Sequence, residues 1–399
     1  MNSGSQQNPS QGLRVLHVNG GNLFGGVETI LVTLARLRDC CPNMESHFAL
    51  CHEARLSREL IGAGAPVHML GNVRISRPWT VLRARARMRR LLRKIQFDVV
   101  VCHMTWSQAI FGPVVRRRRI PLIFYLHNRT DGRHFIDRWA RLEAKPDLAL
   151  CVSRDTEKTC RNVFPAAPTK VIYSPIPLNK SGFEQERSRV RREFDVAEDA
   201  PVIVQVSRME AWKGHASLLR ALHLLRERED WRCWIVGGPQ APSEVAYAQH
   251  LKEMAGELGI ADRVRFLGER SDVPRLLAAA DIMCQPNTST EGFSIVFMEG
   301  CLASLPIITT AIGGALEIVD ESSGILVPLQ DLDALTESLR RLLDDRELRV
   351  QMGRAGYRRV NEMCDPASQL HKLAKTLSSV AHKEVDFSGD RITAHGTIQ

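Results

Sequence analysis

The sequence predicts an α/β protein with two Rossmann-like, doubly wound domains, each a parallel sheet covered by helices on both faces. Short apolar segments of strand length alternate with amphipathic helical segments, and this alternation occurs twice along 399 residues. Several of the apolar segments end in glycine-rich loops. The two halves also differ in charge, since residues 1–180 carry a net charge of +16 and the remainder −7. At roughly 100–200 residues per domain, the length accommodates two domains.

The first half opens with a strand at residues 13–19, a glycine-rich loop at 20–26 and a helix at 27–37, in which apolar residues recur with helical spacing. Strand, glycine-rich loop and helix in this order begin a Rossmann-like unit. Further buried strands are predicted at 98–102, 122–126 and 147–152.

The second half repeats the pattern. It predicts strands at 202–206, 232–236, 264–267, 281–285 and 305–309, and helices at 216–228, 245–258, 294–303 and 332–343. Pro175, Pro177 and Gly182 interrupt the periodicity between the halves. We therefore expect a disordered tail at 1–12, domains at 13–178 and 179–365, a helix at 366–383 that crosses back to the first domain, and a flexible tail at 384–399.

Several classes of protein are excluded or disfavoured by composition. No apolar stretch is long enough to span a membrane, and the polar first residues do not form a secretory signal. The 10 cysteines are scattered without the spacing of a zinc site, which favours reduced, buried thiols in a cytoplasmic protein. The basic first half fits nucleic acid, an anionic membrane or an acidic substrate.

Candidate functional residues cluster after the strands of the second half. Glu291 and Glu299 stand in a loop and in the helix that follows it, and the start of that helix near Ser294 offers free backbone N–H groups to a phosphate. The alternative is an acidic helix start with one buried glutamate. Arg208 and Lys213, after the strand at 202–206, can clamp a diphosphate. Taken singly, each is as well explained as a solvated surface cation.

Together these motifs resemble the retaining glycosyltransferases of family 4, over roughly residues 13–357. The similarity lies in Gly25-Gly26-Val27-Glu28, in Arg208 and Lys213 five positions apart, in the spacing of Glu291 and Glu299, in Gly313-Gly314 followed by Glu317, and in the segment 324–328. The resemblance implies the GT-B fold, in which two Rossmann-like domains enclose the active site in the cleft between them.

The resemblance also implies roles for individual residues. Arg208 and Lys213 would hold the donor diphosphate and stabilise the leaving nucleoside diphosphate, without a metal ion or cofactor. Glu291 would contact the donor sugar near its anomeric centre, with His127 close to the reacting sugar. Glu299 would hydrogen-bond the ribose, and the backbone N–H groups of Phe293, Ser294 and Ile295 would meet phosphate or sugar. Gly25 and Gly26 would let the first domain approach the phosphates closely. A segment that includes Gly268 and Glu269 would line the base. His103 is a weaker candidate, because a capped loop histidine is as good an explanation.

An arginine-rich helix is predicted at 80–95, with Val81, Ala84, Met88, Leu91 and Ile95 on its apolar face, and a second basic cluster follows at 116–119. One interpretation is contact with an anionic membrane that carries a lipid-linked acceptor. The alternative is a solvated helix face. Nucleic acid is disfavoured, because no aromatic residues are interleaved with the cluster.

The leading hypothesis is a retaining, metal-independent hexosyltransferase. It would move a sugar from a UDP- or GDP-sugar to a glycan or lipid-linked acceptor in polysaccharide or glycolipid biosynthesis. We expect it in the cytoplasm, peripheral to the inner face of the plasma membrane. The alternatives are a sugar-nucleotide 2-epimerase of the same fold and a nucleotide-sugar-binding protein without turnover. A dehydrogenase is disfavoured, because the first glycine-rich loop lacks the G-x-G-x-x-G order.

Overall fold

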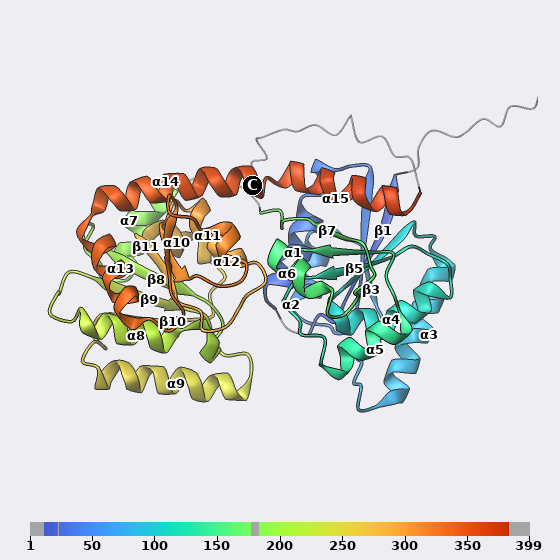
Figure 1. The fold of residues 1–399 in the computed structure, drawn as a ribbon, viewed down its shortest axis with the longest axis horizontal. Coiled ribbons are helices and arrows are strands. Elements are labelled where there is room, and N and C mark those ends of the chain that lie inside the picture. Colours follow the sequence, from blue (N-terminus) through green and yellow to red (C-terminus); the bar gives the residue numbers. More distant parts are fainter. Residues whose placement is uncertain (1–11, 23, 177–182, 383–399) are drawn as a thin grey trace, which may run out of the picture. The chain divides into compact units, whose positions relative to one another are not determined.

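The computed structural model describes residues 12–22, 24–176 and 183–382, and it divides the chain into two compact units (Figure 1). The first unit contains the residues up to 177 together with those from 364 onward, and the second contains residues 178–363. The tails expected at 1–12 and 384–399 lie outside the described residues, apart from residue 12.

The first unit contains a parallel sheet of seven strands within the described residues, in the order β3-β2-β1-β4-β5-β6-β7. Apolar side chains on both faces bury the central strands β1, β4 and β5. The strands are β1 (Leu13–Asn19), β2 (Met44–Leu50), β3 (Val67–Met69), β4 (Val99–His103), β5 (Leu122–Leu126), β6 (Leu148–Cys151) and β7 (Thr169–Val171).

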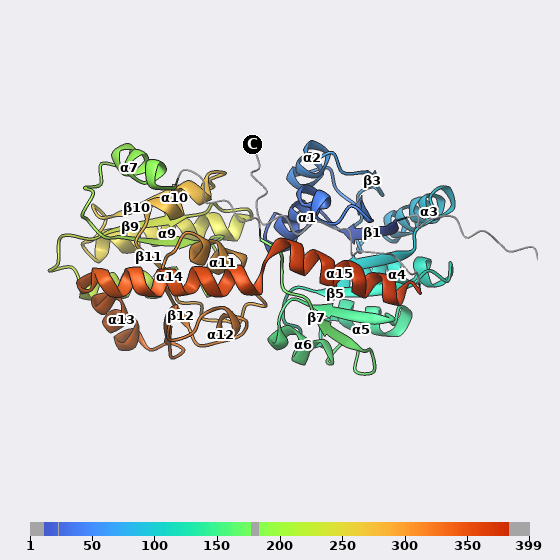
Figure 2. The ribbon, with the colours of Figure 1, turned by 90° about the horizontal axis from the view of Figure 1, so that it is seen from above.

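Helices cover both faces of this sheet. The helical elements are α1 (Gly26–Arg36), η1 (Arg38–Cys40), α2 (Arg55–Gly62), α3 (Pro78–Lys94), α4 (Met104–Arg116), α5 (Phe135–Glu143), α6 (Arg154–Cys160) and α15 (Pro366–Val380). On one face, α3 and α4 pack against Leu16, Val18, Val100 and Cys102. Right-handed crossovers place α1 and α2 on the opposite face, because the chain moves outward in the other direction after β1. Helix α15 belongs to the first unit and lies near η1 (Figure 2).

The second unit contains a parallel sheet in the order β10-β9-β8-β11-β12-β13, six strands in the part of the chain that is described. The strands are β8 (Val202–Val206), β9 (Arg232–Val236), β10 (Val264–Gly268), β11 (Ile282–Gln285), β12 (Ile307–Thr310) and β13 (Gly324–Val327).

Its helical elements are α7 (Phe183–Glu193), η2 (Ala211–Lys213), α8 (His215–Leu224), α9 (Pro242–Glu257), α10 (Val273–Ala279), α11 (Ile295–Leu302), α12 (Ala315–Ile318), α13 (Leu332–Asp344) and α14 (Arg346–Met363). Figure 1 shows α8 and α9 on one side of the sheet and α7, α10 and α11 on the other. Helix α14 packs closely on α11, since a Cβ at Gly356 would lie 3.2 Å from Cys301 Sγ.

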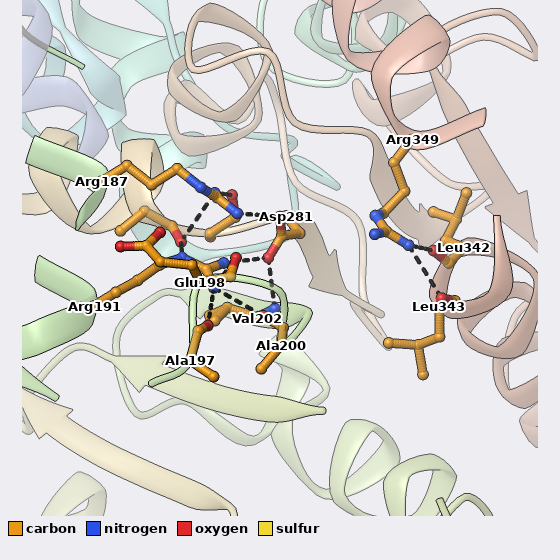
Figure 3. Close-up of polar contacts among 12 residues, drawn as sticks. Arg187, Arg191, Ala197, Glu198, Ala200, Val202, Asp281, Leu342, Leu343 and Arg349 are labelled. Atoms are coloured by element: carbon orange, nitrogen blue, oxygen red, sulfur yellow. Dashed lines mark hydrogen bonds and ion pairs between the residues drawn. The ribbon is translucent and has the colours of Figure 1, made fainter. Parts of the chain in front are cut away.

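A buried arginine fastens α7 to the amino end of this sheet (Figure 3). Arg191 is fully buried and donates to Asp281 Oδ2 at 2.5 Å and to four backbone carbonyl oxygens, of Ala197, Glu198, Ala200 and Ala279. Arg187 donates to the other carboxylate oxygen at 2.7 Å. The Val202 amide completes the cluster by donating to Asp281 Oδ2 at 2.7 Å, which ties the helix to β8 and β11.

The predicted fold class is confirmed, with two doubly wound parallel sheets. In each sheet the connections reverse direction between two central strands, β1 and β4 in the first unit and β8 and β11 in the second. In open α/β sheets, ligands bind beyond the carboxyl ends of the strands at such a reversal. The functional residues are therefore sought at these two edges.

Candidate active site

Arg208 lies just beyond the carboxyl end of β8, and two carboxylates hold it. Its Nη2 donates to Glu210 Oε1 at 2.6 Å and to Glu244 Oε1 at 2.9 Å. Its Nε is buried and has no hydrogen-bond partner among the described residues. An arginine has five N–H donors, so a fixed guanidinium with an unpaired buried donor can bind a further oxygen-rich group.

Glu244 was not predicted from the sequence. It lies in the first turn of α9, is buried, and accepts at 2.7 Å from the backbone N–H of Gln240. The carboxylate meets Arg208 because β8 and β9 are neighbouring strands whose following segments emerge at the same edge of the sheet. Acidic residues are so common in the first turn of a helix that no pattern in the sequence distinguishes this contact.

Lys213 and Glu291, in the segments that follow β8 and β11, form a mostly buried ion pair. Lys213 Nζ lies 2.6 Å from Glu291 Oε1 and 4.1 Å from the centre of the Trp212 ring. Glu291 Oε2 accepts from Asn287 Nδ2 at 3.2 Å, and Asn287 Oδ1 accepts from Gln285 Nε2 at 3.1 Å. These two amides, at the end of β11 and just after it, were not predicted from the sequence, and they orient the glutamate.

Gly313 and Gly314 shape the loop that carries Glu291. The Gly314 amide donates to the Glu291 carbonyl at 3.0 Å. A Cβ at Gly314 would lie 2.1 Å from the carbonyl oxygen of Gly292, and Gly313 has a left-handed φ of 60°. A side chain would therefore clash at one position and strain the backbone at the other. These glycines allow two backbone segments to approach each other, which explains them without a ligand.

The N-terminus of α11 follows the same loop. Ser294 is its N-cap residue, is 3% exposed, and makes no side-chain cap hydrogen bond, so its hydroxyl has no partner within the described part of the chain. Phe293 before it is buried, and Ile295 begins the helix. One helical turn on, burial raises the pKa of Glu299 from 4.5 to about 7.

Gly268 and Glu269 lie at the end of β10, beside the loop after β9. The Gly237 amide donates to the Gly268 carbonyl at 2.8 Å, and a Cβ at Gly238 would lie 3.0 Å from Glu269 Cβ. The second unit thus gathers all of its predicted site residues along the carboxyl edge of one sheet.

The first unit holds the other predicted residues. Gly25 is the N-cap of α1 and Gly26 its first residue. Glu28 accepts at 3.0 Å from the Gly25 amide and at 3.4 Å from Asn19 Nδ2, so it closes the turn that leads from β1 into the helix. This turn follows the carboxyl end of β1 at the reversal point of the first sheet.

His127 follows β5 and belongs to a group of three histidines. His103 Nδ1 lies 2.9 Å from His127 Nε2, and His103 Nε2 lies 3.1 Å from His17 Nδ1. Burial lowers the pKa of both His17 and His127 to about 3, and it places the pKa of His103 well below the ordinary value. The sequence marked His103 only as a weak candidate and did not mark His17.

No group of three or more His, Cys, Asp or Glu side chains suited to a metal ion occurs in residues 12–22, 24–176 and 183–382. Over the same ranges, no helix is both long and apolar enough to cross a membrane.

The sequence was compared with protein families and with curated proteins. The family descriptions "Glycosyltransferase Family 4" and "Glycosyl transferases group 1" match residues 24–180 and 186–359. A GDP-mannose-dependent alpha-(1-6)-phosphatidylinositol monomannoside mannosyltransferase of Mycolicibacterium smegmatis is 30% identical over 68% of this chain and 74% of its own length. A D-inositol 3-phosphate glycosyltransferase of Corynebacterium glutamicum is 27% identical over 73% of this chain and 75% of its own.

Solved structures share the fold. Anabaena HepE, solved in complex with UDP, is 23% identical with a TM-score of 0.81, covering 92% of this chain and all of that one. A glycosyltransferase from Rickettsia africae is 19% identical with a TM-score of 0.82, covering 94% of this chain and all of its own. Sequence motifs, two doubly wound sheets and these relatives agree: the chain is a glycosyltransferase of family 4 with the GT-B fold.

Proposed function

We propose that the protein transfers a sugar from a nucleoside-diphosphate sugar to a glycan or lipid-linked acceptor, with retention of anomeric configuration and without a metal ion. The observation that carries this proposal is the pair of cations, Arg208 and Lys213, fixed by carboxylates at the carboxyl edge of the second sheet. The names of the relatives support a nucleotide-sugar donor, since one is GDP-mannose-dependent and a structural neighbour was solved with UDP-glucose.

The two cations account for leaving-group stabilisation. As the bond to the anomeric carbon breaks, negative charge grows on the diphosphate, and donors fixed in advance stabilise this charge without reorganising. Lys213 Nζ carries three N–H donors, of which Glu291 occupies one. Arg208 contributes the free Nε together with Nη1. These donors supply the charge compensation that a divalent cation provides in other transferases, which is the basis for proposing metal independence.

The remaining residues fit the other parts of a donor. Glu299 would accept hydrogen bonds from ribose hydroxyls, and the backbone N–H groups at the start of α11 would meet phosphate or sugar oxygens. Gly268 and Glu269 would line the base. For retention, the acceptor hydroxyl would attack from the face that the leaving group departs from, and the departing phosphate would take its proton.

The acceptor side of the proposal rests on α3. At the start of this helix, Trp79 and Leu82 are 58% and 62% exposed, and the side chains of Arg83, Arg90 and Arg93 are also exposed. Apolar and aromatic residues flanked by arginine are typical of helices that lie in a membrane interface. We propose that this surface binds an anionic bilayer and brings the protein to a lipid-linked acceptor there.

Not every arginine of α3 is available for such a contact. Arg85 donates to the carbonyl oxygens of Ile110 and Ala109, at 2.7 and 3.1 Å, and its guanidinium lies 5.6 Å from the centre of the Trp139 ring. Arg87 donates to the Leu70 carbonyl at 3.2 Å. These two side chains stabilise the first unit, so the membrane proposal depends on the others.

Ligand-dependent thermal unfolding tests the donor site. The protein is heated with UDP, GDP, ADP and their common sugar conjugates, first with a chelator and then with Mg²⁺. Saturation at a hundred times the dissociation constant adds about 2.7 kcal/mol, a readily measured rise in Tm. A rise with one nucleotide, equal with and without Mg²⁺ and absent in Arg208→Ala, supports the proposal. A rise that requires Mg²⁺ contradicts metal independence.

Product analysis tests the reaction. The configuration at the anomeric carbon of the transferred sugar, determined by NMR of the isolated product, reports retention or inversion. Appearance of an epimerised sugar nucleotide without acceptor would contradict transfer and support the 2-epimerase alternative.

A further inference from the structure

Three histidines connect the central strands of the first sheet. His17 lies within β1, His103 is the last residue of β4, and His127 follows β5. Strands β1 and β4 are the pair between which the connections reverse direction, so the group spans the point where a doubly wound sheet binds ligands. The three side chains are 1%, 1% and 4% exposed.

The rings are joined end to end. His17 Nδ1 and His103 Nε2 are 3.1 Å apart, and His103 Nδ1 and His127 Nε2 are 2.9 Å apart. Both nitrogens of the central ring are used, so the group is a chain rather than a set of ligands converging on one point. This geometry distinguishes it from a metal site, in which the nitrogens face a common centre.

Neighbouring aromatic residues hold the chain in place. The Tyr125 ring lies 4.4 Å from the His127 ring and 5.5 Å from the His103 ring, measured between centroids, and its hydroxyl donates to the Ile172 carbonyl at 3.1 Å. Phe48 stacks on His17 with centroids 5.4 Å apart. Met104, directly after His103, has a left-handed φ of 65°, a conformation that is unfavourable for a non-glycine residue. The backbone is thus strained at the residue that follows the central histidine.

The connections restrict the protonation states. A neutral imidazole has one N–H and one acceptor nitrogen, and each N···N contact needs one of each. Each contact joins Nδ1 of one ring to Nε2 of the next. If His103 carries its proton on Nδ1, then His17 must do so as well, and His127 must accept at Nε2 and carry its own on Nδ1. The only other arrangement has all three protons on Nε2.

The nitrogens at the two ends of the histidine chain lack a hydrogen-bond partner. His17 Nε2 and His127 Nδ1 are buried without a hydrogen-bond partner among the described residues. A buried polar atom without a hydrogen-bond partner is unfavourable, so each of these two nitrogens is suited to a further partner. The three rings can adopt only two arrangements of tautomers. A partner that favours one tautomer at one end of the histidine chain therefore also sets the tautomer of the ring at the other end.

We propose that His17 and His103 are positioning residues that fix the tautomer of His127, and so decide whether its Nδ1 donates to or accepts from a hydroxyl of the reacting sugar. This inference rests on the proposed function only for the identity of that hydroxyl. The low pKa values of the three rings agree with a chain that is neutral throughout the physiological range.

The experiment is long-range ¹H–¹⁵N correlation NMR on protein labelled with ¹⁵N-histidine, which identifies the tautomer of each ring. We expect His17, His103 and His127 to show one and the same tautomer. Mixed tautomers among the three, or a doubly protonated ring at neutral pH, would overturn the proposal. The pair His47 and His68 is an internal control, because it does not belong to the three-histidine chain. His47 Nδ1 lies 3.0 Å from His68 Nε2, and His47 Nε2 lies 2.8 Å from Glu45 Oε1.

Two substitutions of the central ring separate positioning from packing. His103→Gln keeps one donor and one acceptor, whereas His103→Leu fills space without either. With Leu we expect His17 and His127 to lose their common tautomer while the His47 and His68 resonances stay unchanged. We also expect kcat to fall at least tenfold with donor KM unchanged, and Gln to restore part of kcat.

Equal kcat in the two variants would overturn the positioning role. The NMR result does not depend on turnover, so the two proposals fail separately. If the three rings share one tautomer but the protein transfers no sugar, the proposed function is overturned and the coupling of the three tautomers is supported.

Discussion

Lys213 Nζ lies 2.6 Å from Glu291 Oε1, so the cation expected to hold the donor diphosphate is bound to the carboxylate expected beside the donor sugar. Both side chains are mostly buried, and the Lys213 ammonium lies over the face of the Trp212 ring. A carboxylate orients the ammonium but also competes with a phosphate for it. We therefore expect Glu291 to act on the donor in two ways, through the sugar it would contact and through the lysine it holds.

Replacing Lys213 by alanine is expected to lower kcat/KM for the donor by about 10²–10³, the usual cost of one donor to a developing negative charge. The loss leaves Glu291 without its cation, so Lys213→Arg, which keeps the charge, should retain more activity. Steady-state kinetics over a range of donor concentrations measures both. Lys252→Ala, at an exposed position on α9, is the control and should match wild type. A Lys213→Ala enzyme as active as that control would contradict the role.

Glu244→Gln is expected to raise the donor KM about tenfold. In the wild type, Arg208 Nη2 lies 2.9 Å from the Glu244 carboxylate, which balances its charge and orients the guanidinium. A neutral amide at this position would orient it less strongly. Glu253→Gln, on the exposed side of the same helix, should leave KM unchanged. Titration calorimetry with the nucleoside diphosphate gives the binding part directly, and unchanged affinity in Glu244→Gln would refute the prediction.

Glu299 should make stability and donor binding depend on pH in opposite directions. Its folded-state pKa of about 7 exceeds the unfolded value of 4.5, so the folded state holds an extra proton between these values. Stability therefore decreases as pH rises from about 4.5 to 7, by about 3 kcal/mol at most. Donor affinity should increase over the upper part of this range, because the ionised carboxylate accepts from ribose hydroxyls more strongly.

Glu299→Gln removes both dependences. The variant should be more stable than wild type at pH 8. It should bind a nucleoside-diphosphate sugar, whose phosphates do not titrate in this range, with an affinity that no longer changes between pH 5.5 and 8. Urea unfolding and calorimetry at several pH values test this, and an unchanged pH profile in the variant would show that another group titrates.

Arg191→Leu should destabilise the protein by about 3–5 kcal/mol, because it leaves Asp281 partly buried with a weaker partner. Arg187→Leu removes a more exposed cation from the same carboxylate and should cost about 1 kcal/mol or less. Urea denaturation of both variants measures the difference. Equal effects would mean that the five hydrogen bonds of Arg191 in Figure 3 contribute little.

Trp79→Ser combined with Leu82→Ser should reduce binding to vesicles that contain anionic lipid, and Arg90→Glu with Arg93→Glu should reduce it further and remove its salt dependence. Val350→Ser, an exposed apolar residue of the second unit, serves as the control. Co-sedimentation at low and high salt is the measurement. Wild-type protein that does not sediment at low salt would contradict the membrane proposal.

The sequence identified those elements whose residues form continuous apolar runs or clear helical periods. Strand β2 was missed because Glu45, Ser46 and His47 interrupt its apolar residues, and α14 was missed because arginines and glycines occupy much of it. In α3 the expected face was nearly right, but Leu92 is buried more deeply than Leu91.

The same reasoning applies to the site. Arg208, Lys213, Glu291 and Glu299 stand in local motifs and could be predicted. Glu244 and His17 acquire their contacts only from which strands are neighbours. Asn287 meets Glu291 only four positions away, in a loop whose conformation neither composition nor periodicity specifies. His17 is one polar residue in an apolar strand, and its partner His103 is 86 positions away. Contacts between segments so distant in sequence are set by the order of strands in the sheet, which composition and periodicity do not specify.

The division of the chain has a consequence for synthesis. Helix α14 of the second unit ends at Met363, and α15, which buries Leu370, Leu373 and Leu377, begins three residues later as part of the first unit. The first unit is therefore synthesised first but is completed last, when α15 has been made. A fragment ending near residue 177 would lack the helix that covers its apolar surface, so attempts to express the amino-terminal half alone should include residues 364–382, fused through a linker.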